Sequence, residues 1–416
     1  MDLYSILKQL NFERLAGSED EIKARNLLKS YLDSYGLSYS EHSFELNTFK
    51  TGNAEISAKN LKIEGLPLGL SQSVEVSGEL YFMENSEQIY CQTGMYKDKI
   101  ILTNTRSPKL ADKLKSEQVA GVIYITKPYR DLNANNLRQR NYEEGTIPAV
   151  YILYEDARKL ASLSGEKITL KIEQQTSKEK AVNLVVDIPG TGEDKTLTCL
   201  CAHYDTVATS VGACDNSAGT VIILKIAEHF SKNKPLRDLR ILFFSCEEMG
   251  LLGSWAYTKE FKEELKQRMG ILINVDVSGD DIAIDTVSTI GTKEHMGYVD
   301  GIFKEEGLFF KNELEIYSSD CMPFSVIEIP SINLARGGGS CSYHIHTKND
   351  SIENVTQRGL ETTFNATKIL CERLLNAKIY PMKAEIDDSL KDKIEKYVFS
   401  STLVEPKLEW KKKYEK

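Results

Sequence analysis

Residues 239–250 read LRILFFSCEEMG, an apolar run that ends in two adjacent glutamates. A run that is apolar at nearly every position is typical of a strand covered on both faces, as in a sheet with helices on each side. Carboxylates at the end of such a strand are strongly disfavoured unless they have partners. We therefore expect Glu247 and Glu248 to share one site if the strand ends at Cys246, with an exposed acidic pair as the alternative.

The sequence around this stretch alternates between strand-like and helix-like patterns. Apolar runs typical of strands occupy residues 182–186, 196–202 and 271–275, and residues 218–230 have the apolar spacing of a helix. This alternation is typical of α/β proteins, in which helices cover a sheet on both faces. The charge-rich tail at 383–416 is interpreted as a solvated helix with a frayed end, and a contact between copies in a homo-oligomer is its alternative.

The first part of the chain has a different character. Ser18 and Glu21 form a capping-box pattern, and the helical repeat that follows ends at Gly36. From residue 51 to 175 short β-like runs are broken by turn residues. These runs include 78–82, 99–103 and 121–125. We predict an α/β domain formed by residues 1–50 and 176–416, with a separate, mostly β insert at 51–175.

Composition limits the partners. The 416-residue chain has 41% hydrophobic and 27% charged residues, which is ordinary for a globular protein, and a net charge of -9. Nucleic acids and anionic membranes require clustered Lys and Arg, so neither is expected as a partner. The N-terminal residues lack the pattern of a secretory signal, and no apolar run reaches the roughly 18 residues needed to span a bilayer. We expect a cytoplasmic protein.

The eight cysteines are expected to be reduced thiols rather than a disulfide framework, because the chain shows no export signal. Cys199 and Cys201 lie two residues apart in an apolar run and would share one face of a strand. The spacing of a redox or metal-binding pair, C-x-x-C, is absent there. Packing in the core is the favoured interpretation for both.

Two of the six histidines stand out. His203 directly follows an apolar strand, where open α/β folds place their sites, although a lone histidine there is often only structural. Asp205 lies two residues further on the same side of an extended chain, so it could accept the second ring N–H and orient a metal-bound imidazole. His346 lies in a polar stretch, SYHIHTKND, at residues 342–350.

Carboxylates complete a candidate metal site. Asp215 lies in a small-residue turn before the helix at 218–230, where it is either a helix N-cap or a carboxylate that bridges two ions. Asp276 follows the apolar run at 271–275. Together with His203, Glu248 and His346 they give two histidines and three carboxylates, a mixture of nitrogen and oxygen donors that suits zinc.

At these residues the chain resembles the co-catalytic zinc exopeptidases that include bacterial leucine aminopeptidase, aminopeptidase Y and glutamate carboxypeptidase II. The matching motifs occur in the same order over about residues 181–375. They are AHYD at 202–205, GACDNSAG at 212–219, CEEMGLLGS at 246–254, NVD at 274–276, SD at 319–320, and HT at 346–347 followed by Asp350. The resemblance implies a mixed central sheet flanked by helices.

The resemblance also implies roles. One zinc ion would be bound by His203, Asp215 and Asp276, and the other by Asp215, Glu248 and His346, with Co²⁺ or Mn²⁺ as substitutes. Glu247 would be the general base, and Asp205, which orients His203, is counted with it as a catalytic residue. The peptide bond between Asp215 and Asn216 is expected to be cis. The insert resembles a protease-associated domain, through residues 96–102, 120–123 and 147–152.

Two departures leave the oxyanion donor open. Relatives carry a histidine where this chain has Cys321, and a tyrosine where it has Ile345. Any of four side chains is a candidate to contact substrate or oxyanion, with a structural role as the alternative for each. They are Tyr317, Arg336, Tyr343 and His344.

The sequence therefore predicts a peptidase that acts on short peptides. The net negative charge favours an aminopeptidase, whereas Arg336 favours a carboxypeptidase of the glutamate carboxypeptidase type. A non-catalytic binding protein on the same scaffold and a glutaminyl cyclase-type transferase with one zinc ion are the rivals from other classes.

Overall fold

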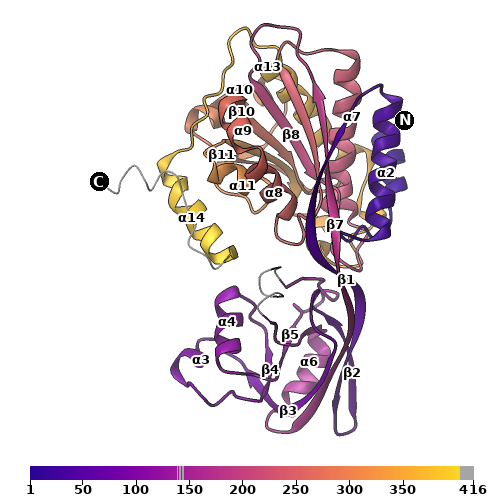
Figure 1. The fold of residues 1–416 in the computed structure, drawn as a ribbon, viewed down its shortest axis with the longest axis vertical. Helices are drawn as coiled ribbons and strands as arrows, with labels where there is room; N and C mark the ends of the chain where they lie inside the picture. The colour runs from indigo at the N-terminus through magenta and orange to yellow at the C-terminus, as the bar shows by residue number, and fades with distance from the viewer. Residues whose placement is uncertain (138, 140–141, 143–144, 403–416) are drawn as a thin grey trace.

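The computed structural model describes residues 1–137, 139, 142 and 145–402, in which 13 strands form one continuous sheet (Figure 1). The end of the charged tail, 403–416, lies outside these residues. The sheet runs through two lobes. In the larger lobe, four neighbouring strands are parallel, so their carboxyl ends meet at one edge of the sheet. They are β9 (Asp238–Phe244), β8 (Leu197–His203), β10 (Met269–Val275) and β13 (Ser331–Gly337).

Antiparallel strands flank these four, so the sheet is mixed, as the resemblance implied. β7 (Lys167–Ile188) pairs antiparallel with β9, and β11 (Ile284–Ile290) pairs antiparallel with β13. The last strand, β12 (Lys311–Leu314), is parallel to β11.

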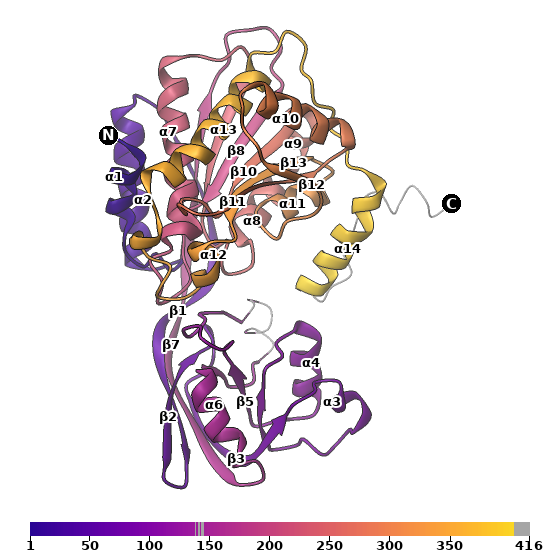
Figure 2. The ribbon, with the colours of Figure 1, turned by 180° about the vertical axis from the view of Figure 1, so that it is seen from behind.

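Helices cover both faces of this part of the sheet (Figures 1 and 2). Along β9, Ile241 and Phe243 belong to one apolar cluster, and Leu242 and Phe244 belong to the other. The alternation confirms a strand buried on both faces. The first cluster includes residues of α1 (Leu3–Leu7), α2 (Glu19–Ser34), α7 (Ala218–Lys232), α10 (Lys293–Glu305) and α13 (Gln357–Leu375). The second includes residues of α8 (Leu252–Glu260), α9 (Lys262–Arg268), α11 (Cys321–Val326) and α14 (Asp388–Thr402).

The smaller lobe grows out of a long two-stranded ribbon. β1 (Ser40–Ala58) and β7 pair antiparallel from Ser40–Val185 to Ser57–Thr169, with one irregularity between Lys50 and Asn53. The passage between lobes therefore lies inside two continuous strands. In the smaller lobe, β3 (Val74–Met83), β4 (Ile100–Thr103), β5 (Gly121–Ile125) and β6 (Ala149–Ile152) are parallel neighbours, and β2 (Leu61–Pro67) joins β6 to β1. Helices α3 (Gln88–Cys91), α4 (Pro108–Ser116) and α6 (Tyr154–Ala161) complete it.

Three details differ from the expectations. Ser18 caps α2 by accepting from the Glu21 N–H at 3.1 Å, but the Glu21 carboxylate bonds to the Gly17 N–H, so the capping box is only half formed. The tail helix α14 is not simply solvated, since its residues Leu390 and Ile394 are buried.

None of the helices in the described ranges is both long and apolar enough to cross a bilayer.

The third difference concerns the cysteines. The expectation of reduced thiols is wrong for two of them, because Cys214 and Cys341 form a disulfide. Their positions, 127 residues apart, give no local spacing signal. Cys199 and Cys201 are free and fully buried, as the core-packing interpretation predicts.

Candidate active site

The parallel strands bring the residues of the site to one edge of the sheet. His203 is the last residue of β8, the two adjacent glutamates follow β9, and Asp276 follows β10. Cys246, two residues after the end of β9, has a left-handed backbone with φ of 60°. A left-handed conformation is uncommon for a residue other than glycine and often marks a functional site. The bend it makes allows Glu247 and Glu248 to face the same site.

Two further residues reach this edge from short irregular elements. Asp215 lies in η2 (Ala213–Ser217), the turn before α7, and its peptide bond to Asn216 is cis, as the resemblance implied. His346 lies two residues beyond α12 (Ser340–His344) and also has a left-handed backbone, with φ of 62°. The structure therefore brings all five expected ligands and Glu247 together.

Asp215 lies between the two histidines. Its Oδ1 is 3.1 Å from Nε2 of His203, and its Oδ2 is 3.1 Å from Nε2 of His346. Each carboxylate oxygen thus faces a different imidazole. This is the arrangement expected of a carboxylate that bridges two metal ions, and not of a helix N-cap.

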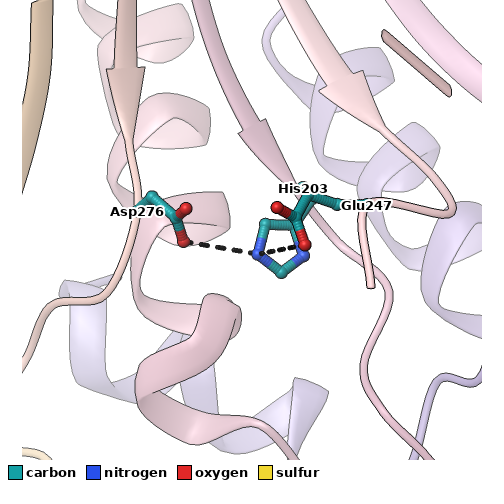
Figure 3. Close-up of side chains that lie close together, drawn as sticks. All are labelled: His203, Glu247 and Asp276. Atoms are coloured by element: carbon teal, nitrogen blue, oxygen red, sulfur yellow. Dashed lines mark ion pairs between the residues drawn. The ribbon is translucent and has the colours of Figure 1, made fainter. Parts of the chain in front are cut away.

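The remaining carboxylates divide between the two histidines. Nε2 of His346 is 3.1 Å from Oε2 of Glu248, and Nε2 of His203 is 3.4 Å from Oδ1 of Asp276. Glu247 is further away, with its Oε2 4.0 Å from Nε2 of His203. Figure 3 shows that Asp276 and Glu247 both point toward the His203 ring. By distance, Glu247 is the carboxylate left over once the shorter pairs have formed.

These residues fit two metal ions. One ligand atom from each of His203, Glu247 and Asp276 lies within 4.8 Å of the others, and the same holds for Asp215, Glu248 and His346. Oε1 of Glu248 and Oδ1 of Asp276 are buried and have no hydrogen-bond partner among the described residues. Buried carboxylate oxygens of this kind need a cation or a donor. Imidazole nitrogens with carboxylate oxygens are a donor set suited to zinc.

The pKa values reflect the crowding of carboxylates. Burial raises the pKa of Glu247 well above its ordinary value, and the charges of Asp276 and Glu248 raise it further, whereas His203 lowers it. Burial likewise raises the pKa of Glu248 to about 7. Burial also opposes ionisation of Asp215, but its hydrogen bonds with both histidines hold its pKa below the ordinary range. Asp215 is thus the carboxylate most firmly held as an anion.

Asp205 holds the glutamates by their backbone. Its Oδ1 accepts from the Glu247 N–H at 3.1 Å and its Oδ2 from the Glu248 N–H at 3.3 Å. The contact expected with the His203 ring is longer, 3.5 Å from Nδ1, and that nitrogen has no hydrogen-bond partner among the described residues. Asp205 therefore fixes the bend after β9 as well as facing the imidazole.

Asp350 and the disulfide join the two irregular elements of the site. The Asp350 carboxylate accepts from the Cys214 N–H at 2.8 Å and from the Asp215 N–H at 3.1 Å. The Cys214–Cys341 bond ties the same turn to α12, just before His346. The turn that carries Asp215 is thus held to the loop that carries His346 both by hydrogen bonds and by a covalent bond.

A cavity of about 360 Å³ opens onto the site. The larger lobe, the smaller lobe and α14 all contribute to its lining. The lining includes Asp215, Glu247, Glu248, Asp276, Tyr317 and His346 of the larger lobe, Arg106, Asn135 and Asn136 of the smaller lobe, and Tyr397 of α14. The last four have no motif in the sequence that marks them as site residues.

Of the four candidate donors, only Tyr317 lines this cavity. Arg336 is buried and turned away from the cavity, since Nη1 of its guanidinium donates to both carboxylate oxygens of Asp285 at 2.7 Å. The Tyr343 hydroxyl donates to the Tyr129 carbonyl of the smaller lobe at 2.9 Å. His344 is absent from the described lining as well. The structure therefore separates three of the candidates from the reaction space.

Known peptidases resemble this chain in sequence. Residues 183–369 match the model of Peptidase family M28. Aminopeptidase YwaD of Bacillus subtilis (strain 168) is 25% identical over 376 residues, which cover 86% of this chain and 81% of that protein.

Solved structures share the fold. A structure of BSAP, a zinc aminopeptidase from Bacillus subtilis, has a TM-score of 0.75 at 22% identity, covering 93% of this chain and 98% of that one. Porphyromonas gingivalis glutaminyl cyclase has a TM-score of 0.51 at 14% identity, covering 89% of this chain and 97% of that one.

Proposed function

Because residues 183–369 match the model of peptidase family M28, we propose that this chain is a zinc aminopeptidase that removes residues from short peptides, with two zinc ions and Glu247 as general base. The observation that carries the proposal is the position of Asp215. Its Oδ1 lies 3.1 Å from Nε2 of His203, and its Oδ2 lies 3.1 Å from Nε2 of His346. The ion at His203 would also have Asp215 and Asp276 as ligands. The second would have Asp215, Glu248 and His346.

The protein groups divide the work of hydrolysis. When bound, the two ions would lower the pKa of a water molecule and polarise the carbonyl of the substrate. Glu247 is the carboxylate that the closest contacts leave free, so it takes the proton from the attacking water and returns it to the leaving amine. Burial raises the pKa of Glu247, which favours its uptake of that proton. Tyr317 is the candidate donor to the oxyanion, because its side chain lines the cavity.

The experiment that tests the role of Glu247 is the variant Glu247→Gln. It should retain two zinc ions per chain, yet lose turnover of aminoacyl-nitroanilides by about 10²–10⁴-fold, the contribution typical of a general base. Metal analysis and nitroanilide assays measure the two quantities. The matched control is Glu248→Gln, in the adjacent residue, which should lose metal as well as activity. A Glu247→Gln enzyme with near wild-type turnover would refute the role.

One observation favours a second candidate, a carboxypeptidase. Arg106 of the smaller lobe lines the cavity and donates to Asn135 Oδ1, at 3.0 Å, and to the Asn136 carbonyl, at 2.8 Å. No carboxylate of the described residues forms an ion pair with it. A guanidinium placed in this way can bind the carboxylate of a substrate.

Two substrates separate the candidates. An aminopeptidase should cleave aminoacyl-nitroanilides and leave N-acylated dipeptides intact, and a carboxypeptidase should do the reverse. If Arg106 binds a substrate carboxylate, Arg106→Ala should raise KM for peptides with a free C-terminus by about tenfold or more, and leave KM for nitroanilides unchanged. The assay is steady-state kinetics on both substrates. Equal KM changes for the two would exclude that contact.

Metal content addresses the glutaminyl cyclase alternative. The likeness to the Porphyromonas gingivalis enzyme concerns the fold alone, because identity is 14%. Two groups of possible metal ligands, one around His203 and one around His346, support two ions. One equivalent of zinc per chain, with cyclisation of N-terminal glutamine, would favour the transferase.

A further inference from the structure

One face of the C-terminal helix α14 packs against the larger lobe. Leu390, Ile394 and Val398, spaced four residues apart, are 1%, 0% and 5% exposed and pack into the apolar cluster that includes α11. Lys393 forms an ion pair with Glu315 at the edge of the sheet. A helix with an apolar stripe at this spacing and a charged anchor beside it has a defined position on the surface that it covers.

That position is beside the space between the two lobes. Figure 1 shows α14 on the opposite side of the molecule from the β1–β7 ribbon, which is where the chain passes between the lobes. The helix contacts α11 of the larger lobe and α4 of the smaller lobe. The ribbon and α14 therefore connect the lobes on two opposite sides.

Through Tyr397, helix α14 contributes to the lining of the cavity at the site. Its side chain is half-buried and lines the cavity that also contains Glu247 and Asp276. Its hydroxyl lies 2.7 Å from Oγ of Ser318, which lines the same cavity next to Tyr317. The ring is thus held by a hydrogen bond at one end and by the anchored helix at the other.

The size of the cavity makes this wall consequential. Its volume of about 360 Å³ is at the lower end of the range for small-molecule sites. An extended peptide adds roughly 3.3–3.6 Å of length with each residue, so a long substrate must leave such a cavity through an opening. An aromatic ring fixed in one wall closes one direction of exit.

We propose that Tyr397 is a specificity-determining residue that restricts the site to short peptides by forming the wall of the cavity on the α14 side. The proposal rests on the peptidase function proposed above. It assigns Tyr397 no part in bond breaking, and predicts that the ring, rather than the hydroxyl, excludes the far end of a long peptide.

The test compares a dipeptide with an octapeptide that has the same N-terminal residue. Tyr397→Ala should raise kcat/KM for the octapeptide relative to kcat/KM for the dipeptide by about tenfold or more. Tyr397→Phe, which keeps the ring, should leave the ratio unchanged, and the larger ring of Tyr397→Trp should lower it. Phe399→Ala is the matched control, because Phe399 is on the same helix, is 52% exposed and is absent from the cavity lining.

A binding measurement makes the test independent of turnover. Titration calorimetry of the zinc-loaded Glu247→Gln protein, with and without Tyr397→Ala, gives Kd for both peptides while neither is consumed. The ratio of octapeptide to dipeptide Kd should fall by about tenfold when the ring is removed. A ratio that changes by less than about twofold overturns the proposal. Failure of the peptidase function would appear differently, as a wild-type protein that binds peptides and cleaves none.

Discussion

Glu21 on α2 is a fully buried carboxylate that lies away from the cavity. It accepts hydrogen bonds from the Gly17 N–H at 2.7 Å, from the Tyr204 hydroxyl at 2.9 Å and from the Ser245 hydroxyl. Burial raises its pKa from 4.5 to about 7, against the lowering effect of these donors. Because Tyr204 and Ser245 adjoin the ends of β8 and β9, Glu21 links the first long helix to the strands that carry the site.

The raised pKa predicts a pH-dependent stability. Between about pH 4.5 and 7 the folded state binds more protons at Glu21 than the unfolded state does, so the free energy of unfolding falls as pH rises, by up to about 1.4 kcal/mol per unit. Glu21→Gln removes this decrease. The difference in melting temperature, variant minus wild type, should therefore become more positive across this window.

Thermal melts at several pH values measure that difference. Glu19→Gln is the control, because Glu19 is exposed on the same helix. The difference between Glu19→Gln and the wild type should stay flat. A flat difference for Glu21→Gln as well would show that the buried carboxylate titrates alike in the folded and unfolded chain.

Residues at strand ends were the part of the site most open to prediction. His203, Glu248 and Asp276 each follow an apolar run, and parallel strands bring such ends together whatever the loops do. The resemblance inferred from the ordered motifs is supported, because residues 183–369 match the model of Peptidase family M28. The carboxylate of Glu21 was misplaced, because a capping pattern is local, whereas the donors that attract it, Tyr204 and Ser245, are about 200 residues away in sequence.

At the scale of elements, the disulfide is the strongest link between η2 and α12. It joins residues 127 apart, and closing a long loop in the unfolded chain is the main source of stability attributed to such bonds. Reduction should lower the free energy of unfolding by about 2–4 kcal/mol. Because α12 leads into His346, reduction should also weaken metal binding at the Glu248 and His346 side of the site.

Melting with and without a dithiol reductant tests this link. The double variant Cys214→Ser with Cys341→Ser is the control. With or without reductant, it should melt at the melting temperature of the reduced wild-type protein. Thiol counting in denaturant should give six free thiols in the oxidised chain and eight after reduction. Six thiols in both the wild type before reduction and the double variant, with identical melting, would show that the bond adds no stability.

The bond also bears on where the protein works. Disulfides are typical of oxidising compartments, whereas the sequence favoured a cytoplasmic protein with reduced thiols. The cytoplasmic location stays a prediction. The thiol count of protein taken directly from its own cells would address it.

At the scale of the whole molecule, the lining of the cavity was beyond the reach of the sequence. Arg106, Glu247 and Tyr397 line one cavity although about 150 residues separate each from the next along the chain. No periodicity or motif encodes such a meeting, which depends on how the smaller lobe and α14 are seated on the larger lobe. The gathering of the strand-end residues was therefore predictable, whereas the residues that line the rest of the cavity were not.

The β1–β7 ribbon shows how a protein of this shape could have arisen. Thr48 and Ser177 are directly paired across it, so the chain leaves for the smaller lobe and returns at neighbouring positions. A two-residue turn could close that gap as an ordinary β-hairpin. Topologically, the smaller lobe is one enlarged hairpin loop. An ancestor could have acquired it in a single insertion, without reordering a strand of the sheet that carries the candidate site and at little cost in loop-closure entropy.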